Sequence, residues 1–328
     1  IVARTVPTVN VEEIVADIIK NVRERGDAAL YEYCEKFDKA KLSTLAVTEE
    51  EIDEAVAQVE PKFLEILERA AVNIRKFHEK QVRNSFIINN ENGIVVGQKV
   101  IPVDRAGLYV PGGTAAYPST VLMDAIPAKI AGCSEIVMVT PPSASGKVNP
   151  VILAAAKVAG VTRIFKMGGA QAVAALAYGT ESVPRVDKIV GPGNAYVAEA
   201  KKQVFGRVSI DMIAGPSEIL VVADGANDPR HVAADMLSQA EHGRDSQAIV
   251  VCNSMALAES IASEVEKQRQ LLSRTDYVAE SLANSRAIIF DNKNDMVAFA
   301  NEYAAEHLII SMEDAWSVAD RITAAGSI

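Results

Sequence analysis

Aromatic residues and long apolar runs are scarce in this chain. Only 5% of the 328 residues are aromatic, although 49% are hydrophobic, so a core must be built mainly from Ala, Val, Ile and Leu, as in helix-covered parallel sheets. No apolar run reaches the roughly 18 residues that span a bilayer, and the N-terminal residues lack the basic patch and hydrophobic region of a secretory signal. We therefore expect a soluble, cytoplasmic α/β protein that does not insert into a membrane.

Cysteine and positive charge are also limited. Cys34, Cys133 and Cys252 are far apart and odd in number, which fits neither a disulfide framework nor a Cys-x-x-Cys zinc site and favours a reducing compartment. Lys and Arg total 33 against 43 Asp and Glu, which leaves a formal net charge of −10. Such a chain repels phosphate backbones, so we expect no general nucleic-acid binding. The length corresponds to about two domains.

The spacing of apolar residues divides the chain into a helical opening and two α/β stretches. Helical spacing runs from residue 11 to about residue 81, and residues 86–103 then alternate around Asn92-Gly93, which predicts a hairpin. Strands alternating with helical segments predict βαβ units and parallel sheets. The expected strands are 135–139, 163–167, 188–190, 218–223, 247–252, 286–290 and 307–310, and helices are expected after Pro118, Pro150, Ala170 and Asn194.

Two further segments have a distinct character. Residues 141–150 are rich in Pro and Ser and predict a loop. At the other end, residues 315–325 predict a helix that Gly326 terminates, and Ser327-Ile328 resembles the first step of another strand. This ending predicts a chain that has been cut short.

Three glycine-rich turns are candidates for phosphate binding: Val110–Thr114, Gly168–Gln171 and Gly191–Asn194. Backbone N–H groups approach an anion closely where no Cβ intervenes, and a following helix N-terminus adds favourable potential. None of the turns matches the G-x-G-x-x-G fingerprint, so each by itself is better explained as a plain turn. All three are expected at the carboxyl ends of parallel strands, where nucleotides bind in such folds. Both interpretations stay open.

The junction between the two stretches and the helix that follows it offer further candidates. Residues 210–218, with Ser217 near their end, form either a rigid linker or a cleft wall. Gln239 and His242 are spaced i and i+3 at the end of a predicted helix, so both can reach one metal ion. A histidine at that place is also commonly a cap that compensates the helix dipole.

Glu306 and His307 place a carboxylate beside an imidazole where a helix gives way to a strand. Both groups carry protons near neutral pH. A Ser-His-Asp hydrolase with His307 as its base is conceivable, but no G-x-S-x-G elbow is present to carry the serine. The histidines at positions 78 and 231 are assigned to structure or solvent.

Six motifs occur here in the order and spacing of one family, and through them the chain resembles the histidinol dehydrogenases over essentially its whole length. The motifs are Tyr109–Gly113, Gly168–Gln171, Gly191–Asn194, Ile210–Glu218, Ser238–His242 and Glu306-His307. The resemblance implies oxidation of L-histidinol to L-histidine through L-histidinal, in two NAD-dependent steps that complete histidine biosynthesis. It also implies a bound zinc ion and a homodimer with shared active sites.

The resemblance assigns roles residue by residue. NAD contacts are implied for Tyr109, Gln171 and Asn194, and substrate contacts for Ser217, Gln239, His242 and His307. Gln239 and His242 are implied as two zinc ligands, with zinc orienting the imidazole and amine of the substrate. His307 is implied as the base that takes the hydroxyl proton, and Glu306 as the group that activates water to hydrate the aldehyde.

The expected fold is α/β, with two Rossmann-like units whose mostly parallel sheets are covered by helices, one unit inserted in the other. Residues 109–216 are expected to form the inserted NAD-side unit, and residues 1–108 plus 217–328 the substrate- and zinc-side unit. The active site is expected in the cleft between them, where Ser217, His242 and Glu306 converge.

The chain also departs from the family. Members carry a C-terminal segment beyond the position of Ile328 that supplies an Asp and a His to the zinc, and a short N-terminal arm. Zinc held by Gln239 and His242 alone is under-coordinated, so weak zinc binding and little activity are expected of these 328 residues by themselves. Ala304-Ala305 replaces a common Gly-Pro pair. The alternatives are a paralogue oxidising another small alcohol, such as a sulfonated diol, and a catalytically silent nucleotide-binding remnant.

Overall fold

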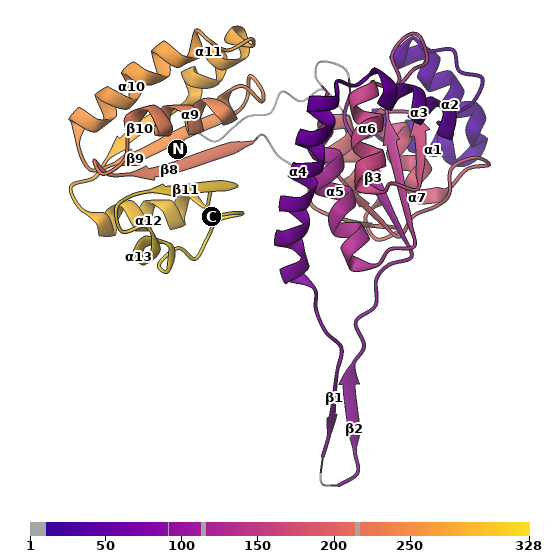
Figure 1. The fold of residues 1–328 in the computed structure, drawn as a ribbon, viewed down its shortest axis with the longest axis horizontal. Helices are drawn as coiled ribbons and strands as arrows, with labels where there is room; N and C mark the ends of the chain where they lie inside the picture. The colour runs from indigo at the N-terminus through magenta and orange to yellow at the C-terminus, as the bar shows by residue number, and fades with distance from the viewer. Residues whose placement is uncertain (1–10, 91, 113–115, 214–216) are drawn as a thin grey trace. The chain divides into compact units, whose positions relative to one another are not determined.

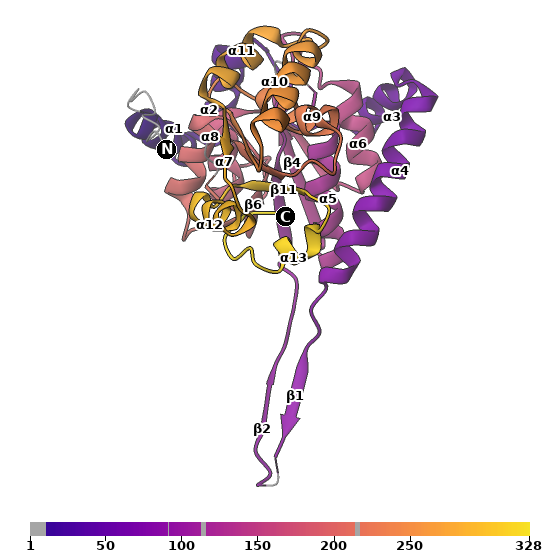
Figure 2. The same cartoon turned by 90° about the vertical axis from the view of Figure 1, so that its left-hand side faces the viewer.

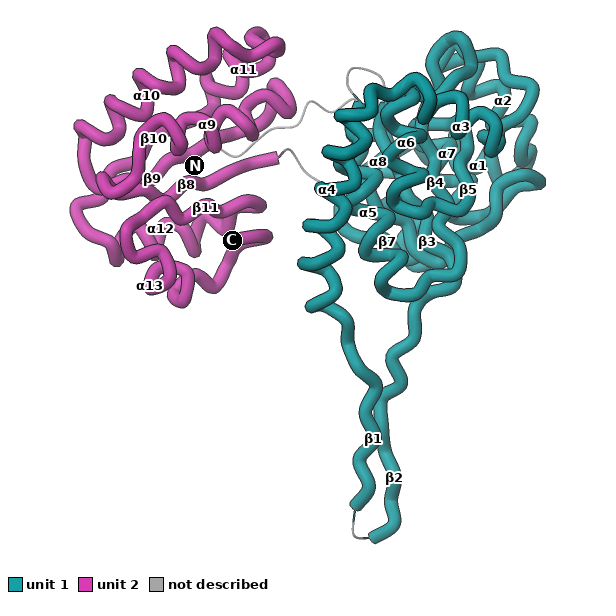
Figure 3. The backbone as a smooth tube through the Cα atoms, viewed as in Figure 1, with its two compact units in different colours: residues 1–214 teal, residues 215–328 magenta. Residues whose placement is uncertain are grey.

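A computed structural model describes residues 11–90, 92–112, 116–213 and 217–328 (Figure 1). Backbone packing divides the chain into two successive units, residues 1–214 and residues 215–328 (Figure 3). This division differs from the expected one, which joined residues 1–108 to residues 217–328. The reason is that the N-terminal helices bury their apolar faces in the same two cores as the first sheet. The units therefore follow one another in sequence, and neither is inserted in the other.

The opening segment is helical, as predicted. Its elements are α1 (Val11–Arg25), α2 (Asp27–Tyr33), the π-helix η1 (Cys34–Asp38), α3 (Glu49–Gln58), α4 (Pro61–His78) and the 3-10 turn η2 (Glu79–Gln81). α1 buries Val15, Ile18, Ile19 and Val22, which is the i, i+3, i+4, i+7 stripe of a helix with one apolar face. α3 begins in a capping box, in which Thr48 bonds the backbone N–H of Glu51 and the Glu51 carboxylate bonds that of Thr48.

The first sheet has five parallel strands in the order β5-β4-β3-β6-β7. Along β4, Ile136 and Met138 face one core while Val137 and Val139 face the other. Helices α3 to α6 contribute to the first of these cores, and α1, α2, α7 and α8 to the second. The elements are β3 (Arg105–Tyr109), α5 (Pro118–Ala131), β4 (Glu135–Thr140), α6 (Pro150–Ala159), β5 (Arg163–Lys166), α7 (Gly169–Tyr178), β6 (Lys188–Val190), α8 (Ala195–Val204) and β7 (Ser209–Ile210).

The predicted hairpin is present as β1 (Phe86–Asn89) and β2 (Val95–Gln98). The strands are antiparallel, with Phe86 opposite Gln98, and all their residues are exposed. Figure 1 and Figure 2 both show this ribbon extending away from the helices of its unit. A two-stranded ribbon with exposed apolar side chains on both faces is marginally stable by itself.

The second unit repeats the strand order of the first. Its four parallel strands lie in the order β10-β9-β8-β11, so in both sheets the first strand lies between the second and the fourth. Helices α9 to α11 pack on one face, and α12 and α13 on the other. The elements are β8 (Glu218–Ala223), α9 (Pro229–Ala240), β9 (Gln247–Cys252), α10 (Met255–Arg269), α11 (Thr275–Asn284), β10 (Arg286–Ile289), α12 (Lys293–Tyr303), β11 (His307–Ser311) and α13 (Ala315–Ala319). The predicted α/β class with parallel, helix-covered sheets is confirmed.

The last residues differ in part from the prediction. The helix expected over residues 315–325 ends at Ala319, because the Asn301 amide takes over its bonds: Nδ2 donates to the Arg321 carbonyl at 3.0 Å, and Oδ1 accepts from the Thr323 N–H at 2.7 Å. The expected strand start is confirmed, because Ser327 forms a parallel bridge with His307. No helix among the described residues is long and apolar enough to cross a membrane.

Candidate active site

The carboxyl edge of the first sheet gathers the glycine-rich turns, as predicted. The turns follow β3, β5 and β6. The strand order reverses at β3, with β4 and β5 on one side and β6 and β7 on the other. Ligands of open α/β sheets bind in the crevice at such a reversal. Gly113 and Thr114 of the first turn lie outside the described residues.

Tyr109, at the end of β3, and Gln171, in the first turn of α7, are both buried at this edge. Tyr109 is 4% exposed and Gln171 is 2% exposed. The Tyr109 hydroxyl accepts a hydrogen bond of 2.9 Å from the backbone N–H of Gly169, at the start of α7. Burial raises the pKa of Tyr109 to about 12, so the hydroxyl stays protonated. Both side chains are thus packed inside the unit rather than presented on its surface.

Asn194 is exposed and begins α8. Its Oδ1 accepts hydrogen bonds from the backbone N–H groups of Tyr196 at 3.1 Å and Val197 at 3.2 Å, which is the bonding of a helix N-cap. The capping bonds fix the orientation of the amide. They leave its NH2 as the group that can donate to a ligand.

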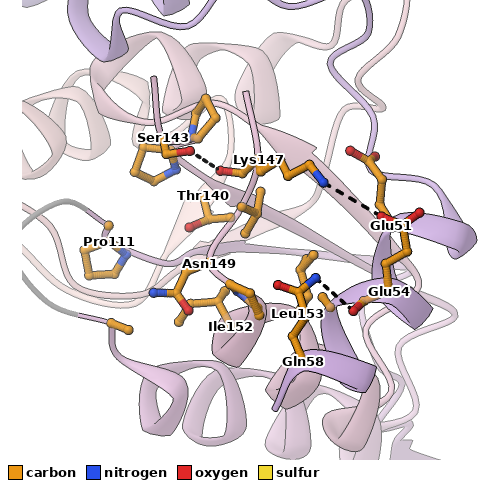
Figure 4. Close-up of a pocket in the computed structure, with 17 residues that line it drawn as sticks. Glu51, Glu54, Gln58, Pro111, Thr140, Ser143, Lys147, Asn149, Ile152 and Leu153 are labelled. Atoms are coloured by element: carbon orange, nitrogen blue, oxygen red, sulfur yellow. Dashed lines mark hydrogen bonds and ion pairs between the residues drawn. The ribbon is translucent and has the colours of Figure 1, made fainter. Parts of the chain in front are cut away.

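A cavity of about 560 Å³ opens at the same edge, beside β3 and β4. Its lining comes from α3, the residues after β3 and β4, and the start of α6, as Figure 4 shows for Glu51, Glu54, Gln58, Pro111, Thr140, Ser143, Lys147, Asn149, Ile152 and Leu153. Lys147 Nζ lies 3.8 Å from Glu54 Oε2. Glu51 pairs at 2.5 Å with Lys166, which ends β5 and is nearly buried. The sequence predicted only a loop over residues 141–150, and nothing in its pattern indicated a cavity.

A group of charges beside Gly191, in which Lys201 is buried and Asp211 is partly exposed, was also missed by sequence reasoning. The ammonium group of Lys201 donates to the Gly191 carbonyl at 2.9 Å and pairs with the Asp211 carboxylate. The other Asp211 oxygen accepts from the Gly191 N–H at 2.8 Å. Nearby, Asp124 Oδ2 is buried with no hydrogen-bond partner in the described part of the chain. Burial, with a contribution from Asp211, raises the pKa of Asp124 to about 7.

The candidates of the second unit lie at the amino edge of its sheet. Ser217 immediately precedes β8, and Glu306-His307 lies at the start of β11, which pairs with β8. Gln239 is in the last turn of α9, and His242 is in the turn that leads from α9 to β9. All five candidates therefore share one edge, at which the C-terminus of α9 contributes the negative end of its dipole.

The metal donors of this edge are few. α9 ends at Ala240, so His242 lies in the following turn, where its N–H donates to the Gln239 carbonyl at 3.2 Å. Gln239 is 6% exposed, whereas His242 is exposed. Within the described ranges, no three His, Cys, Asp or Glu side chains are grouped so as to hold a metal. Structural and catalytic zinc sites take three or four protein ligands, so these two residues do not complete one.

His307 is bonded to a residue that the sequence analysis did not identify as part of a site. Its Nδ1 lies 3.0 Å from the Ser327 hydroxyl, and its Nε2 lies 3.9 Å from Oε1 of Glu306. Ser327 Oγ also lies 3.3 Å from the backbone carbonyl of Glu306. The only sequence signal was the expected strand start at Ser327, which the parallel bridge to His307 explains.

Tyr303 adds a second unpredicted contact at this edge. Its hydroxyl lies 3.2 Å from the Glu218 carboxylate and 2.8 Å from the side-chain carbonyl of Gln247. It thereby links α12 to the first residues of β8 and β9. This link holds the helix that precedes Glu306 against the sheet.

Comparison with known proteins agrees with these motifs. A family model described as Histidinol dehydrogenase matches residues 3–328. The chain belongs to the histidinol dehydrogenase family. It is 53% identical over 315 residues to the histidinol dehydrogenase of Geobacillus kaustophilus, covering 96% of this chain and 74% of that protein. It is 51% identical over 312 residues to the enzyme of Clostridium acetobutylicum, covering 95% and 72%.

A solved structure of histidinol dehydrogenase from Elizabethkingia anophelis has the same fold. The TM-score is 0.95 at 42% identity, covering 99% of this chain and 75% of that one. The chain therefore spans about three quarters of the length of these relatives. The resemblance drawn from the motifs is confirmed, and the protein is an oxidoreductase.

Proposed function

We propose that this protein oxidises L-histidinol to L-histidine through L-histidinal, with NAD as the hydride acceptor, in the last two steps of histidine biosynthesis. The observation that carries the proposal is the Glu306–His307 pair, which lies at an exposed sheet edge in a member of the histidinol dehydrogenase family. Oxidation of a primary alcohol to an acid needs a base for the hydroxyl proton and a group that activates water for the aldehyde. His307 and Glu306 supply these two functions.

The bonding of Ser327 sets the tautomer of His307. A serine hydroxyl has one proton, and a backbone carbonyl only accepts. When Ser327 donates to the Glu306 carbonyl, 3.3 Å away, the His307 Nδ1–H donates to Ser327 Oγ at 3.0 Å. Nε2 then holds a free lone pair, so His307 can take the hydroxyl proton of the alcohol as a neutral imidazole.

Glu306 acts in the second oxidation. Its Oε1 lies 3.9 Å from Nε2 of His307, and both side chains are partly exposed. A carboxylate at this distance can accept a proton from water that attacks the aldehyde, while the imidazole beside it serves the first step. Ser217, Gln239, His242 and His307 are proposed as substrate contacts because they line the same amino edge.

The carboxyl edge of the first unit is proposed as the NAD site. Three observations support it: the reversal of strand order at β3, an α7 N-terminus whose N-cap residue is Gly168, and a cavity within the size range of ligand pockets. Asn194 offers its amide NH2 to the nucleotide, and Tyr109 and Gln171 shape the surface from below. NAD supplies the hydride acceptor when it is bound.

We further propose that Gln239 and His242 bind zinc together with ligands from outside the described residues. The described residues by themselves do not complete the site, so no catalytic step is assigned to the metal. A zinc ion at the C-terminal end of α9 would also meet the favourable end of the helix dipole.

A homodimer is proposed as well, with the β1–β2 ribbon as part of its interface. Ile87 is 78% exposed and Val95 is 61% exposed. Monomeric proteins seldom expose contiguous apolar surface of this kind. A second copy of the chain, as the family resemblance implies, would cover it. All three cysteines are free, which is consistent with the proposed cytoplasmic location.

The decisive experiment is NADH formation from NAD by the full-length gene product, with L-histidinol and with dihydroxypropanesulfonate as substrates. The proposal expects turnover with histidinol and the release of two NADH per molecule. Turnover with the sulfonated diol alone would show that the protein is the paralogue and that histidinol is not its substrate. Stoichiometric NAD binding without turnover, even with added zinc, would instead favour the silent remnant.

A further inference from the structure

We propose that Lys201 and Asp211 are positioning residues for NAD, which hold the Gly191 backbone and the turn that carries Asn194 in the geometry that the cofactor needs. The inference rests on the proposed NAD site at this edge. Lys201 lies outside the motifs of the family resemblance. Asp211 lies in the segment 210–218, where only Ser217 was given a role.

Both polar atoms of the Gly191 backbone are held by side chains. The N–H donates to Asp211 Oδ2 at 2.8 Å, and the carbonyl accepts from Lys201 Nζ at 2.9 Å. Lys201 and Asp211 also pair with each other. Hydrogen bonds to charged groups are stronger than those between neutral groups. The N–H and the carbonyl of Gly191 belong to the two peptide groups that flank its Cα. The pair of Lys201, which is buried, and Asp211, which is partly exposed, therefore restricts the rotation of both peptide groups. We call these bonds the Gly191 clamp.

The Gly191 clamp connects the residues expected to contact NAD. Asn194 caps the helix on which Lys201 lies, so that helix and the turn move together. Gly191 has a φ of +115°, and a Cβ there would overlap the carbonyl oxygen of Tyr109 and lie 3.0 Å from Asp124 Oδ2. The turn thus packs backbone against backbone on the end of β3. A change in the conformation of the Gly191 backbone would therefore shift both Asn194 and Tyr109.

The burial of Lys201 points to positioning more than to stability. Lys201 is 2% exposed, and a buried ammonium ion needs acceptors to offset its lost hydration. Asp211 and the Gly191 carbonyl supply them, with Asp124 close by. A well-packed apolar side chain often stabilises a fold as much as a buried ion pair does. The ion pair differs in that it holds two specific backbone atoms.

The test measures the dissociation constant for NADH, by fluorescence titration, in variants of the full-length gene product. Asp211→Ala removes the acceptor of the Gly191 N–H and leaves Lys201 beside Asp124, so the charges stay balanced. We expect its dissociation constant for NADH to rise about tenfold while the KM for histidinol changes less than about twofold. Asp211→Asn keeps an accepting oxygen and is expected to bind within about threefold of the unchanged protein.

Asp224→Ala is the matched control. Asp224 follows β8 and accepts two backbone N–H bonds, from Ala226 at 3.0 Å and Glu313 at 3.1 Å, at the carboxyl edge of the other sheet. Its NADH binding is expected to stay unchanged. Lys201→Met, which removes the bond to the Gly191 carbonyl, gives an independent variant if Asp211→Ala does not fold, and it is expected to weaken NADH binding to a similar extent.

Three outcomes would overturn the inference, at two different levels. Unchanged NADH binding in Asp211→Ala or in Lys201→Met would remove the positioning role and leave the NAD site in place. The same would follow if Asp224→Ala weakened binding as much as Asp211→Ala. Absence of NADH binding in the unchanged protein would overturn the proposed function itself, and the inference with it.

Discussion

The Ser327 hydroxyl lies 3.0 Å from Nδ1 of His307 and 3.3 Å from the carbonyl of Glu306. One serine thus contacts both members of the proposed proton-handling pair, from a strand position beside β11. It fixes the ring of His307 by a bond to Nδ1, while Nε2 lies 3.9 Å from the Glu306 carboxylate.

Removal of this bond is expected to slow catalysis. Ser327→Ala should lower kcat about tenfold, because the imidazole loses the partner that sets its orientation and tautomer. The KM for NAD should stay unchanged, because NAD is proposed to bind the other unit. The control is Ser317→Ala in α13. It removes a hydroxyl that donates a hydrogen bond to the Asp314 carbonyl and should leave kcat unchanged. Equal kcat values in the two variants would contradict the role of Ser327.

Asp124 makes stability depend on pH. Burial raises its pKa from 3.8 to about 7, so the folded chain keeps a proton that the unfolded chain has lost. The free energy of unfolding therefore falls as the pH rises from about 4 to about 7, by up to roughly 1.4 kcal/mol per pH unit. Asp124→Asn removes this loss. In urea unfolding, we expect the free energy of unfolding of Asp124→Asn to exceed that of the unchanged protein at pH 8. The difference should be smaller at pH 5.

The control for this measurement is Asp17→Asn, a change at an exposed position of α1. Its stability difference from the unchanged protein should not vary between the two pH values. If the Asp124→Asn difference were equally flat, the burial of the Asp124 carboxyl would not be the source of the pH dependence.

Ala304 adopts a backbone conformation that suits glycine. It has a φ of 51° and a ψ of 54° at the end of α12, and left-handed backbone costs an L-residue about 1–2 kcal/mol. Ala304→Gly should raise the free energy of unfolding by about 0.5–1 kcal/mol, after the greater flexibility of glycine in the unfolded chain is counted. Ala298→Gly, at an exposed position inside α12, should lower it by about 1 kcal/mol. Changes of the same sign would contradict this account.

The exposed ribbon should govern self-association. Ile87→Glu places a charge on the apolar surface of β1 and is expected to convert a dimer to monomers in light scattering coupled to gel filtration. Thermal stability of the isolated chain should be little affected, because Ile87 is 78% exposed. Val72→Glu, on an exposed position of α4, is the control and should leave the dimer intact. A dimer that survives the Ile87 change would show that the interface lies elsewhere.

Local patterns predicted most of the fold. The strands at 188–190 and 218–223 appear at the expected bounds, and the helices begin at or next to the expected residues, because apolar periodicity and turn residues act over short distances. The expected division into units differs from the backbone packing for residues 11–108, since the choice of which sheet a helix covers depends on long-range packing. The helix after residue 315 was overextended for a similar reason: a distant residue, Asn301, takes up its backbone bonds.

Sequence motifs indicate candidate site residues only where the chemistry is carried by neighbours in the chain, and they miss contacts between residues far apart. Glu306 and His307 are candidates from the sequence because they are adjacent. Ser327 is 20 residues from His307, and Lys201 and Asp211 meet at Gly191 only through the folding of two elements. Lysine and aspartate are common in exposed positions, so neither residue type signals an ion pair that holds a backbone turn.

Both sheets use the same strand order, yet the proposed cofactor residues stand at the carboxyl ends of one and the proposed substrate residues at the amino ends of the other. Insertions in the turns at the carboxyl ends of the strands should therefore be harmful in the first unit and tolerated in the second. The turn at residues 224–228, after β8, should accept added residues with little loss of turnover. The corresponding turn after β3, which leads from Tyr109 to Gly112, should not.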